Sequence, residues 1–178
     1  MDPRIDALLS ILARYRDDLK RAFEAVPSGW LGTAPDEASW SVAQVLEHLV
    51  ATERSVTKLL SGFVPQAPLR PTDDDFDPDE FARELDMPFV LDRSRPVKGS
   101  QPPGEMDAAQ AWTALAASRK GLLDRMEEAR GRRLEGFSFA HPATGQPLDA
   151  YQWIAFVGLH EGRHAEQIRA IVSRLDAT

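Results

Sequence analysis

The 178-residue chain contains no cysteine. Disulfide bonds, thiolate metal ligands and a cysteine nucleophile are therefore excluded, and the absence suits a reducing cytoplasm. No apolar run approaches the roughly 20 residues that a membrane-spanning helix needs. A signal peptide is not predicted either, because acidic residues appear at once and no cleavage site of small residues follows. We therefore expect a cytoplasmic protein with no membrane partner.

The chain also lacks an excess of positive charge. Its 21 lysine and arginine residues are outnumbered by 28 aspartate and glutamate residues, which leaves a formal net charge of −7. Because phosphate binding requires a basic surface, a nucleic-acid partner is not expected. The 43% of hydrophobic and 28% of charged residues are typical of a globular protein. The length favours one domain, residues 1–178.

Four segments carry the three- and four-residue apolar spacing of amphipathic helices. Helices are expected over residues 3–26, 39–61, 107–128 and 149–174, with N-caps at Asp2, Ser39, Asp107 and Asp149. Gly62 is expected to end the second helix. The inward face of the third is expected to consist of Trp112, Leu115, Ala116, Leu122, Leu123 and Met126. No β-hairpin is predicted, although residues 136–145 are compatible with a short extended piece.

A long stretch rich in proline and acidic residues, about 63–106, separates the second and third of these helices. We expect a short helix over 78–85 within it, and the acidic run at 72–80 is interpreted as solvated surface. A connection of this length is able to return the chain along the bundle, so that the second and third helices run parallel. The sequence therefore predicts an all-α four-helix bundle with a long crossover, and the crossover is a candidate lid.

The sequence has only four histidines, and three of them lie within the expected helices. His160 and His164 stand four residues apart on the inward stripe of the last helix, so their imidazoles share one face. His48 lies on the inward side of the second helix. Two imidazoles at this spacing are able to share a metal ion, and a third from a facing helix completes a three-histidine site with open positions. Histidines that satisfy one another and water within a purely structural bundle are the alternative.

The sequence leaves open the roles of three residues near these histidines. Glu161 is either a helix-surface carboxylate paired with Arg163 or Arg169, or a base at a metal-bound water. Gln44 precedes the second-helix histidine by one turn and is a candidate to orient its imidazole. His141 is either a loop residue packed over the end of the bundle or a pocket residue.

Residues 160–164 read His-Glu-Gly-Arg-His and match the H-E-x-x-H motif of zinc peptidases. In those enzymes a third ligand follows downstream. Only 14 residues follow His164, and neither extended form of the motif fits them. A peptidase is therefore not predicted.

At these residues the chain resembles the DinB/YfiT-like superfamily. The resemblance rests on WSVAQVLEHL at 40–49, HPxxG at 141–145, HEGRHAEQI at 160–168 and the segment 102–126. It covers residues 1–174 and is weakest over 63–100. It implies a four-helix bundle, commonly a homodimer, and a divalent metal that is often zinc or nickel. The metal ligands that it implies are His48, His160 and His164.

The resemblance leaves the activity open. Some members are S-transferases or isomerases that use a low-molecular-weight thiol, namely bacillithiol, mycothiol or glutathione, and others are described as metal-dependent hydrolases. Thiol transfer predicts cations or hydrogen-bonding groups at the mouth of the site for the carboxylates of the thiol, and the sequence offers the cations Arg70, Arg93, Arg95 and Lys98. We therefore expect a metal-dependent enzyme that acts on a small molecule, with Glu161 as a catalytic candidate. A metal-binding stress-response protein without turnover is the alternative.

Overall fold

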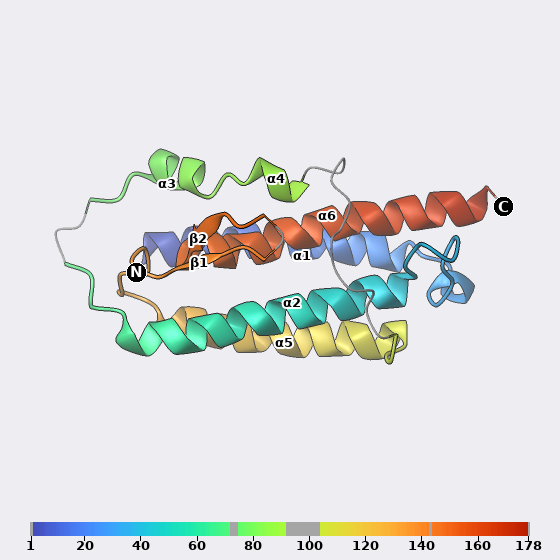
Figure 1. Cartoon of the computed structure of the whole chain (residues 1–178), viewed down its shortest axis with the longest axis horizontal. Coiled ribbons are helices and arrows are strands. Elements are labelled where there is room, and N and C mark those ends of the chain that lie inside the picture. Colours follow the sequence, from blue (N-terminus) through green and yellow to red (C-terminus); the bar gives the residue numbers. More distant parts are fainter. Residues whose placement is uncertain (1, 72–74, 92–103, 143, 178) are drawn as a thin grey trace.

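The computed structural model describes residues 2–71, 75–91, 104–142 and 144–177. Its four long helices are α1 (Pro3–Glu24), α2 (Val42–Phe63), α5 (Ala108–Glu128) and α6 (Ala150–Asp176) (Figure 1). The predicted four-helix bundle is thereby confirmed. Within the described ranges, none of the helices combines the length and the apolar composition that a bilayer crossing requires.

Smaller elements connect the four long helices. Two short helices lie over α6, namely α3 (Pro78–Glu84), which was predicted, and α4 (Pro88–Leu91), which was not. Single 3-10 turns, η1 and η2, occupy Ser28–Trp30 and Val64–Gln66. An antiparallel hairpin that was not predicted pairs β1 (Ser138–Ala140) with β2 (Pro147–Asp149).

Each long helix begins at a side chain that accepts hydrogen bonds from first-turn N–H groups. Asp2, Asp107 and Asp149 cap α1, α5 and α6 as predicted. The predicted cap of α2 was wrong: Ser41 takes this position instead of Ser39, because Gln44 stands three residues later and completes a capping box with it. The predicted end at Gly62 was also wrong, since α2 continues to Phe63.

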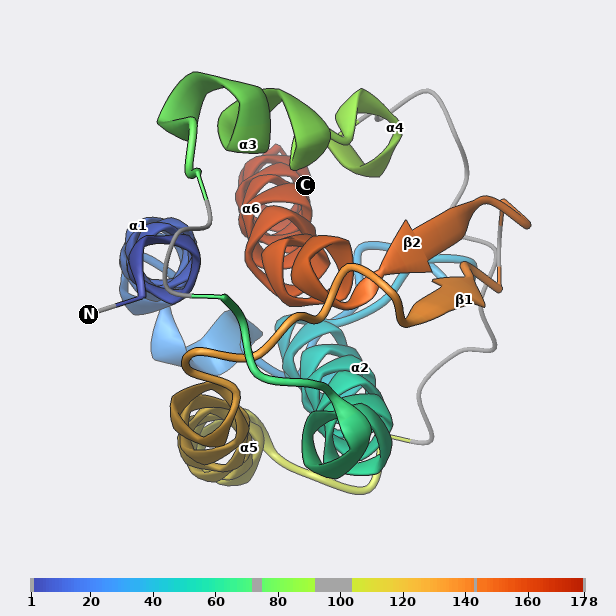
Figure 2. The same cartoon turned by 90° about the vertical axis from the view of Figure 1, so that its left-hand side faces the viewer.

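The helices α2 and α5 run parallel, as the long crossover predicted (Figures 1 and 2). Glu47, near the start of α2, accepts a hydrogen bond from the N–H of Gly104, just before α5 (2.9 Å). Further along, Glu53 of α2 binds Arg119 of α5 at 2.5 Å. The helices α1 and α6 form the second parallel pair, which runs in the opposite direction. Because of the crossover, α2 and α5 are parallel neighbours, and the bundle still consists of four long helices.

The short helices carry the crossover along α6. The side chain of Gln152 donates a hydrogen bond to the carbonyl oxygen of Glu84 (2.9 Å), which ends α3. About three turns further along α6, Arg163 donates to the carbonyl oxygen of Val90 in α4 (3.1 Å). Two side chains of α6 therefore hold the backbone of this segment.

A layer of charged side chains divides the bundle core into two apolar parts. The first part includes Leu8, Leu12, Val56, Leu60, Leu122 and Met126, and the second includes Leu19, Leu46, Leu49, Leu115, Ile168 and Ile171. Between them, each long helix contributes one charged residue; these are Arg16, Glu53, Arg119 and Glu161. The two positive and two negative charges are able to cancel within this layer.

The inward face of α5 differs in part from its prediction. Leu115, Leu122 and Met126 are buried as expected. Leu123 is 37% exposed and Ala116 is also exposed, so both were assigned to the wrong face. Ser118 and Arg119 turn inward instead, because both donate hydrogen bonds to the buried carboxylate of Glu53.

Two glycines of α6 allow α1 to approach closely. A Cβ atom at Gly162 would lie 2.5 Å from Cδ1 of Tyr15, and one at Gly158 would lie 3.2 Å from Cγ2 of Ile11. Gly162→Ala is therefore expected to lower the free energy of unfolding by about 1–3 kcal/mol, as overpacking does. Urea unfolding followed by circular dichroism measures this change.

Gly62→Ala is the matched control for this substitution, because Gly62 also lies within a long helix. A Cβ atom there meets no atom within 4 Å. Since alanine is favoured over glycine in helices by up to about 1 kcal/mol, this variant should be as stable as the parent or more stable. Equal stabilisation by both substitutions would contradict the close approach of Tyr15.

Candidate metal centre

Three histidines from two antiparallel helices converge in the structure. Nε2 of His164 lies 3.0 Å from Nε2 of His160, which in turn lies 3.4 Å from Nε2 of His48. The candidate ligand atoms of the three residues all lie within 4.8 Å of one another. His160 and His164 come from successive turns of α6, and His48 comes from the facing side of α2. The arrangement is the one that the sequence spacing predicts.

Burial keeps these imidazoles neutral. It lowers the pKa of His164 to about 3 and the pKa of His48 below its ordinary value. The pKa of His160 is lowered well below its ordinary value, first by burial and then by the neighbouring His164 and His48. Because metal binding requires the unprotonated ring, each imidazole can offer a lone pair at neutral pH.

Gln167 fixes the orientation of His164. Its side-chain oxygen Oε1 lies 2.6 Å from Nδ1 of His164. A carbonyl oxygen only accepts, so we assign the proton of this ring to Nδ1, which leaves the lone pair of Nε2 facing the other two histidines. Metal-binding histidines are commonly held in this way through their second nitrogen. Gln167 was not predicted as a site residue, although it follows His164 by three positions and therefore lies on the same helix face.

The donor set fits a divalent cation. If Nε2 of His160 carries a proton, it can donate it to His164 or to His48, but not to both. Hydrogen bonds among the three rings therefore leave one buried ring nitrogen without a partner, which is energetically unfavourable. A cation that accepts all three lone pairs removes this conflict, and three imidazoles are a common ligand set for zinc.

Glu161 was expected as a helix-surface carboxylate paired with Arg163 or Arg169. This expectation was wrong, because the residue is buried. Its side chain is only 2% exposed. Oε1 accepts hydrogen bonds from Nε and Nη2 of Arg16 (2.8 and 2.5 Å), and Oε2 lies 3.0 Å from Nη2 of Arg119. Guanidinium groups lie against both oxygens, which assigns Glu161 to the charged layer, while its role as a base at a metal-bound water stays a prediction.

A cavity of about 1080 Å³ adjoins the histidine cluster. His48 and His160 belong to its wall, which is formed by α2, α4, α6 and the hairpin. In Figure 2, α2, α4 and the hairpin lie around one side of α6. His141 also lines the cavity, and its ring stacks on that of Trp153 (centroids 5.7 Å apart, 18° between planes). Of the two roles left open for His141, the pocket residue is therefore the one that the structure supports.

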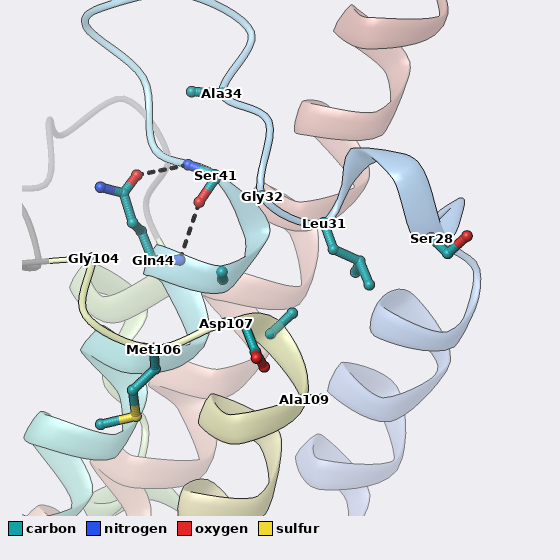
Figure 3. A pocket seen from close by; sticks show the side chains of 12 residues that line it. Ser28, Leu31, Gly32, Ala34, Ser41, Gln44, Gly104, Met106, Asp107 and Ala109 are labelled. Atoms are coloured by element: carbon teal, nitrogen blue, oxygen red, sulfur yellow. Dashed lines mark hydrogen bonds between the residues drawn. The ribbon is translucent and has the colours of Figure 1, made fainter.

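A second cavity, of about 540 Å³, lies where α2 and α5 begin (Figure 3). None of the four histidines lines it. Figure 3 shows Gln44 at this cavity, where its Oε1 accepts a hydrogen bond from the N–H of Ser41 (2.9 Å). The expected contact between Gln44 and His48 is not among the hydrogen bonds of the described residues. Gln44 and Asp107 serve the helix caps here, so we assign no site to this cavity.

Of the four cations expected at the mouth of the site, the structure describes only Arg70, and this residue does not line the histidine cavity. Arg70 binds Glu135 (2.9 Å) and the hydroxyl oxygen of Tyr151 (2.7 Å), away from the residues that line the histidine cavity. Arg93, Arg95 and Lys98 lie outside the described residues. The cations that do line the cavity, Lys58 and Arg163, were not predicted for this role.

Comparisons with known proteins agree with this architecture. The sequence model of the DinB superfamily matches residues 11–168. YuaE, an uncharacterized protein of Bacillus subtilis (strain 168), is 31% identical over 175 residues, which cover 94% of this chain and 99% of YuaE.

Two solved structures share the fold. One is TT2238, a four-helix bundle protein, with 19% identity, a TM-score of 0.56 and coverage of 93% of this chain and 98% of TT2238. The other is YfiT from Bacillus subtilis, described as a probable metal-dependent hydrolase with an unusual four-helix bundle topology. It has 17% identity, a TM-score of 0.59 and coverage of 97% of this chain and 87% of YfiT. The family match and the YuaE relationship together show that this chain belongs to the DinB superfamily.

Proposed function

We propose that this protein is a divalent-metal-dependent enzyme with His48, His160 and His164 as metal ligands. It acts on a small molecule, either by hydrolysis or by transfer of a low-molecular-weight thiol. The observation that carries the proposal is the position of the histidines in the wall of a cavity of about 1080 Å³. A binding protein without turnover requires a closed or shallow site, so this cavity favours the enzyme.

The chain supplies the ligands, their orientation and the walls of the reaction space. A divalent cation bound here supplies Lewis acidity and lowers the pKa of a water or thiol ligand. The three neutral imidazoles leave the positive charge of the cation undiminished and leave coordination positions open. His48 and His160 face the cavity, whereas the buried His164 lies behind them and is held by Gln167. The aromatic rings of His141 and Phe156, with centroids 5.0 Å apart, pack together in the wall of the cavity.

The family relationship supports further parts of the proposal. Zinc or nickel is the proposed metal, because imidazole nitrogen suits both ions. YfiT, which shares the fold, is described as a probable metal-dependent hydrolase, and hydrolysis is accordingly one of the two proposed reactions. A homodimer in the cytoplasm is the proposed form of the protein.

The test uses protein without a histidine tag, stripped of metal with a chelator and reloaded with zinc or nickel. Elemental analysis is expected to find about one metal ion per chain. Ester and lactone hydrolysis, and conjugation of bacillithiol or glutathione to an alkyl halide, are then measured with metal-free protein as the control. We expect metal-dependent turnover in one of the two reaction classes. Protein that takes up no metal would overturn the proposal, and metal uptake without turnover would favour the binding protein.

A further inference from the structure

We propose that the cavity beside the histidines binds an aromatic organic anion, with its ring against the aromatic wall and its acid group paired with Lys58. This inference rests on the proposed function, because it names the substrate class of the same site. It is argued from the volume, the rings and the charges of the cavity.

The volume of the cavity calls for a whole organic ligand. At about 1080 Å³ it is as large as the upper end of ordinary ligand sites. A cation and a few waters would leave most of this space unused, since a water occupies about 30 Å³ in the liquid. Large cavities in proteins are few, which makes a ligand of several rings the natural occupant.

The wall of the cavity is unusually rich in aromatic rings. They come from α2, α4, the hairpin and α6, and they are Phe63, Phe89, Phe139, His141, Trp153 and Phe156. Phe156 stacks on His160 with centroids 5.0 Å apart, and His141 contacts both Phe156 and Trp153. Trp153, His141 and Phe156 thus form a continuous series of rings that leads to the histidine cluster, and Phe63 and Phe139 stack on each other elsewhere in the wall. A planar aromatic ligand packs against such a wall better than a flexible chain does.

The charge of the cavity is opposite to that of the protein. Among the described residues that line it, only Lys58 and Arg163 are charged, and both are cations. The whole chain carries a net charge of −7, so the absence of carboxylates from this lining is not what its composition predicts. Arg163 donates a hydrogen bond to the carbonyl oxygen of Val90 and retains its positive charge there. The lining therefore favours an anion.

Lys58 is the residue placed to bind the acid group. Its side chain is exposed, and no carboxylate in the described part of the chain forms an ion pair with it. It follows His48 by ten positions of α2, which corresponds to about 15 Å along the helix axis. The aromatic rings of a ligand therefore fit between its acid group, paired with Lys58, and a second group that reacts at the histidines.

Isothermal titration calorimetry on the zinc-loaded protein tests the proposal with 2-naphthoate, the neutral 2-naphthamide and the aliphatic octanoate. We expect 2-naphthoate to bind most tightly. Because exposed ion pairs are weak, Lys58→Gln should lower its affinity by about two- to fivefold, with no change for 2-naphthamide. Lys58→Glu should lower it further. Arg54→Gln removes a cation that lies one turn earlier on α2 and outside the lining, and it should have no effect.

Phe139→Ala tests the aromatic wall separately. This ring is 45% exposed on β1, so its removal should leave the fold intact while weakening both naphthyl compounds. Equal affinities for 2-naphthoate and 2-naphthamide, no response to Lys58→Glu, or tighter binding of octanoate would each overturn the proposal. Zinc content is measured on the same samples. Zinc uptake without naphthoate binding refutes this inference alone, whereas naphthoate binding without zinc uptake refutes the proposed function alone.

Discussion

His164→Ala is expected to lower the affinity for zinc by more than 100-fold. The residue is fully buried, its Nε2 lies 3.0 Å from that of His160, and no other described histidine is placed to replace it. Removing a ligand should exceed the roughly 10–100-fold loss that follows removal of a group supporting a ligand. Competition with a chromophoric chelator measures the affinity, and elemental analysis measures the content.

Two further variants make this result specific. Gln167→Ala removes the partner of Nδ1 of His164 and leaves the three imidazoles, so it should lower zinc affinity by about 10–100-fold. His141→Ala removes the histidine that lies outside the cluster and should leave zinc content unchanged. Circular dichroism confirms that each variant is folded. Parental affinity in folded His164→Ala would mean that other residues hold the metal.

Glu53→Gln is expected to lower the free energy of unfolding by roughly 3–5 kcal/mol, which is the usual effect of breaking a buried ion pair. The Glu53 side chain is 1% exposed and binds Arg119 at 2.5 Å, Ser118 at 2.6 Å and Arg16 at 3.4 Å. Glutamine preserves the volume but leaves the buried Arg119 without its closest charge partner. The midpoint of thermal unfolding should fall by about 6–20 °C for a chain of this length.

Asp124→Asn is the matched control for Glu53→Gln. It also replaces a carboxylate by an amide in an ion pair, with Lys120 at 2.9 Å, but both side chains are exposed on α5. Its effect should stay below about 1 kcal/mol, because water screens the charges. If the two substitutions were equally mild, the charged layer would not contribute to stability as its geometry indicates.

Local signals in the sequence accounted for the long helices. Asp2, Asp107 and Asp149 cap the helices that they were expected to cap, since each precedes an apolar periodic segment. The second helix was misplaced by two residues because two serines, Ser39 and Ser41, offered similar caps. Only the glutamine three residues after Ser41 distinguishes them.

Long-range contacts explain what the sequence did not predict. Periodicity assigns a charged residue to the solvent face, so the burial of Glu161 between Arg16 and Arg119 was missed. For the same reason the inward face of α5 was predicted to include Leu123, whereas the buried ion pair of Arg119 determines which face turns inward. The three histidines were found because they interrupt apolar stripes. Their cavity was not, because its walls combine α6 and the hairpin with α2 and α4, which are far from α6 in the sequence.

The parallel pairing of α1 with α6 has a consequence for synthesis. Arg16 and Glu161 are 145 positions apart, and a ribosome adding about 5–20 residues per second needs roughly 7–30 s to pass from one to the other. During that time the apolar stripe of α1, with Leu8, Leu12 and Leu19, lacks α6, the helix against which most of α1 packs. Two of the three clustered histidines, His160 and His164, belong to α6 and are also synthesised late. The core beside α1 therefore stays incomplete until α6 is synthesised, and the three-histidine cluster can form only after translation of α6.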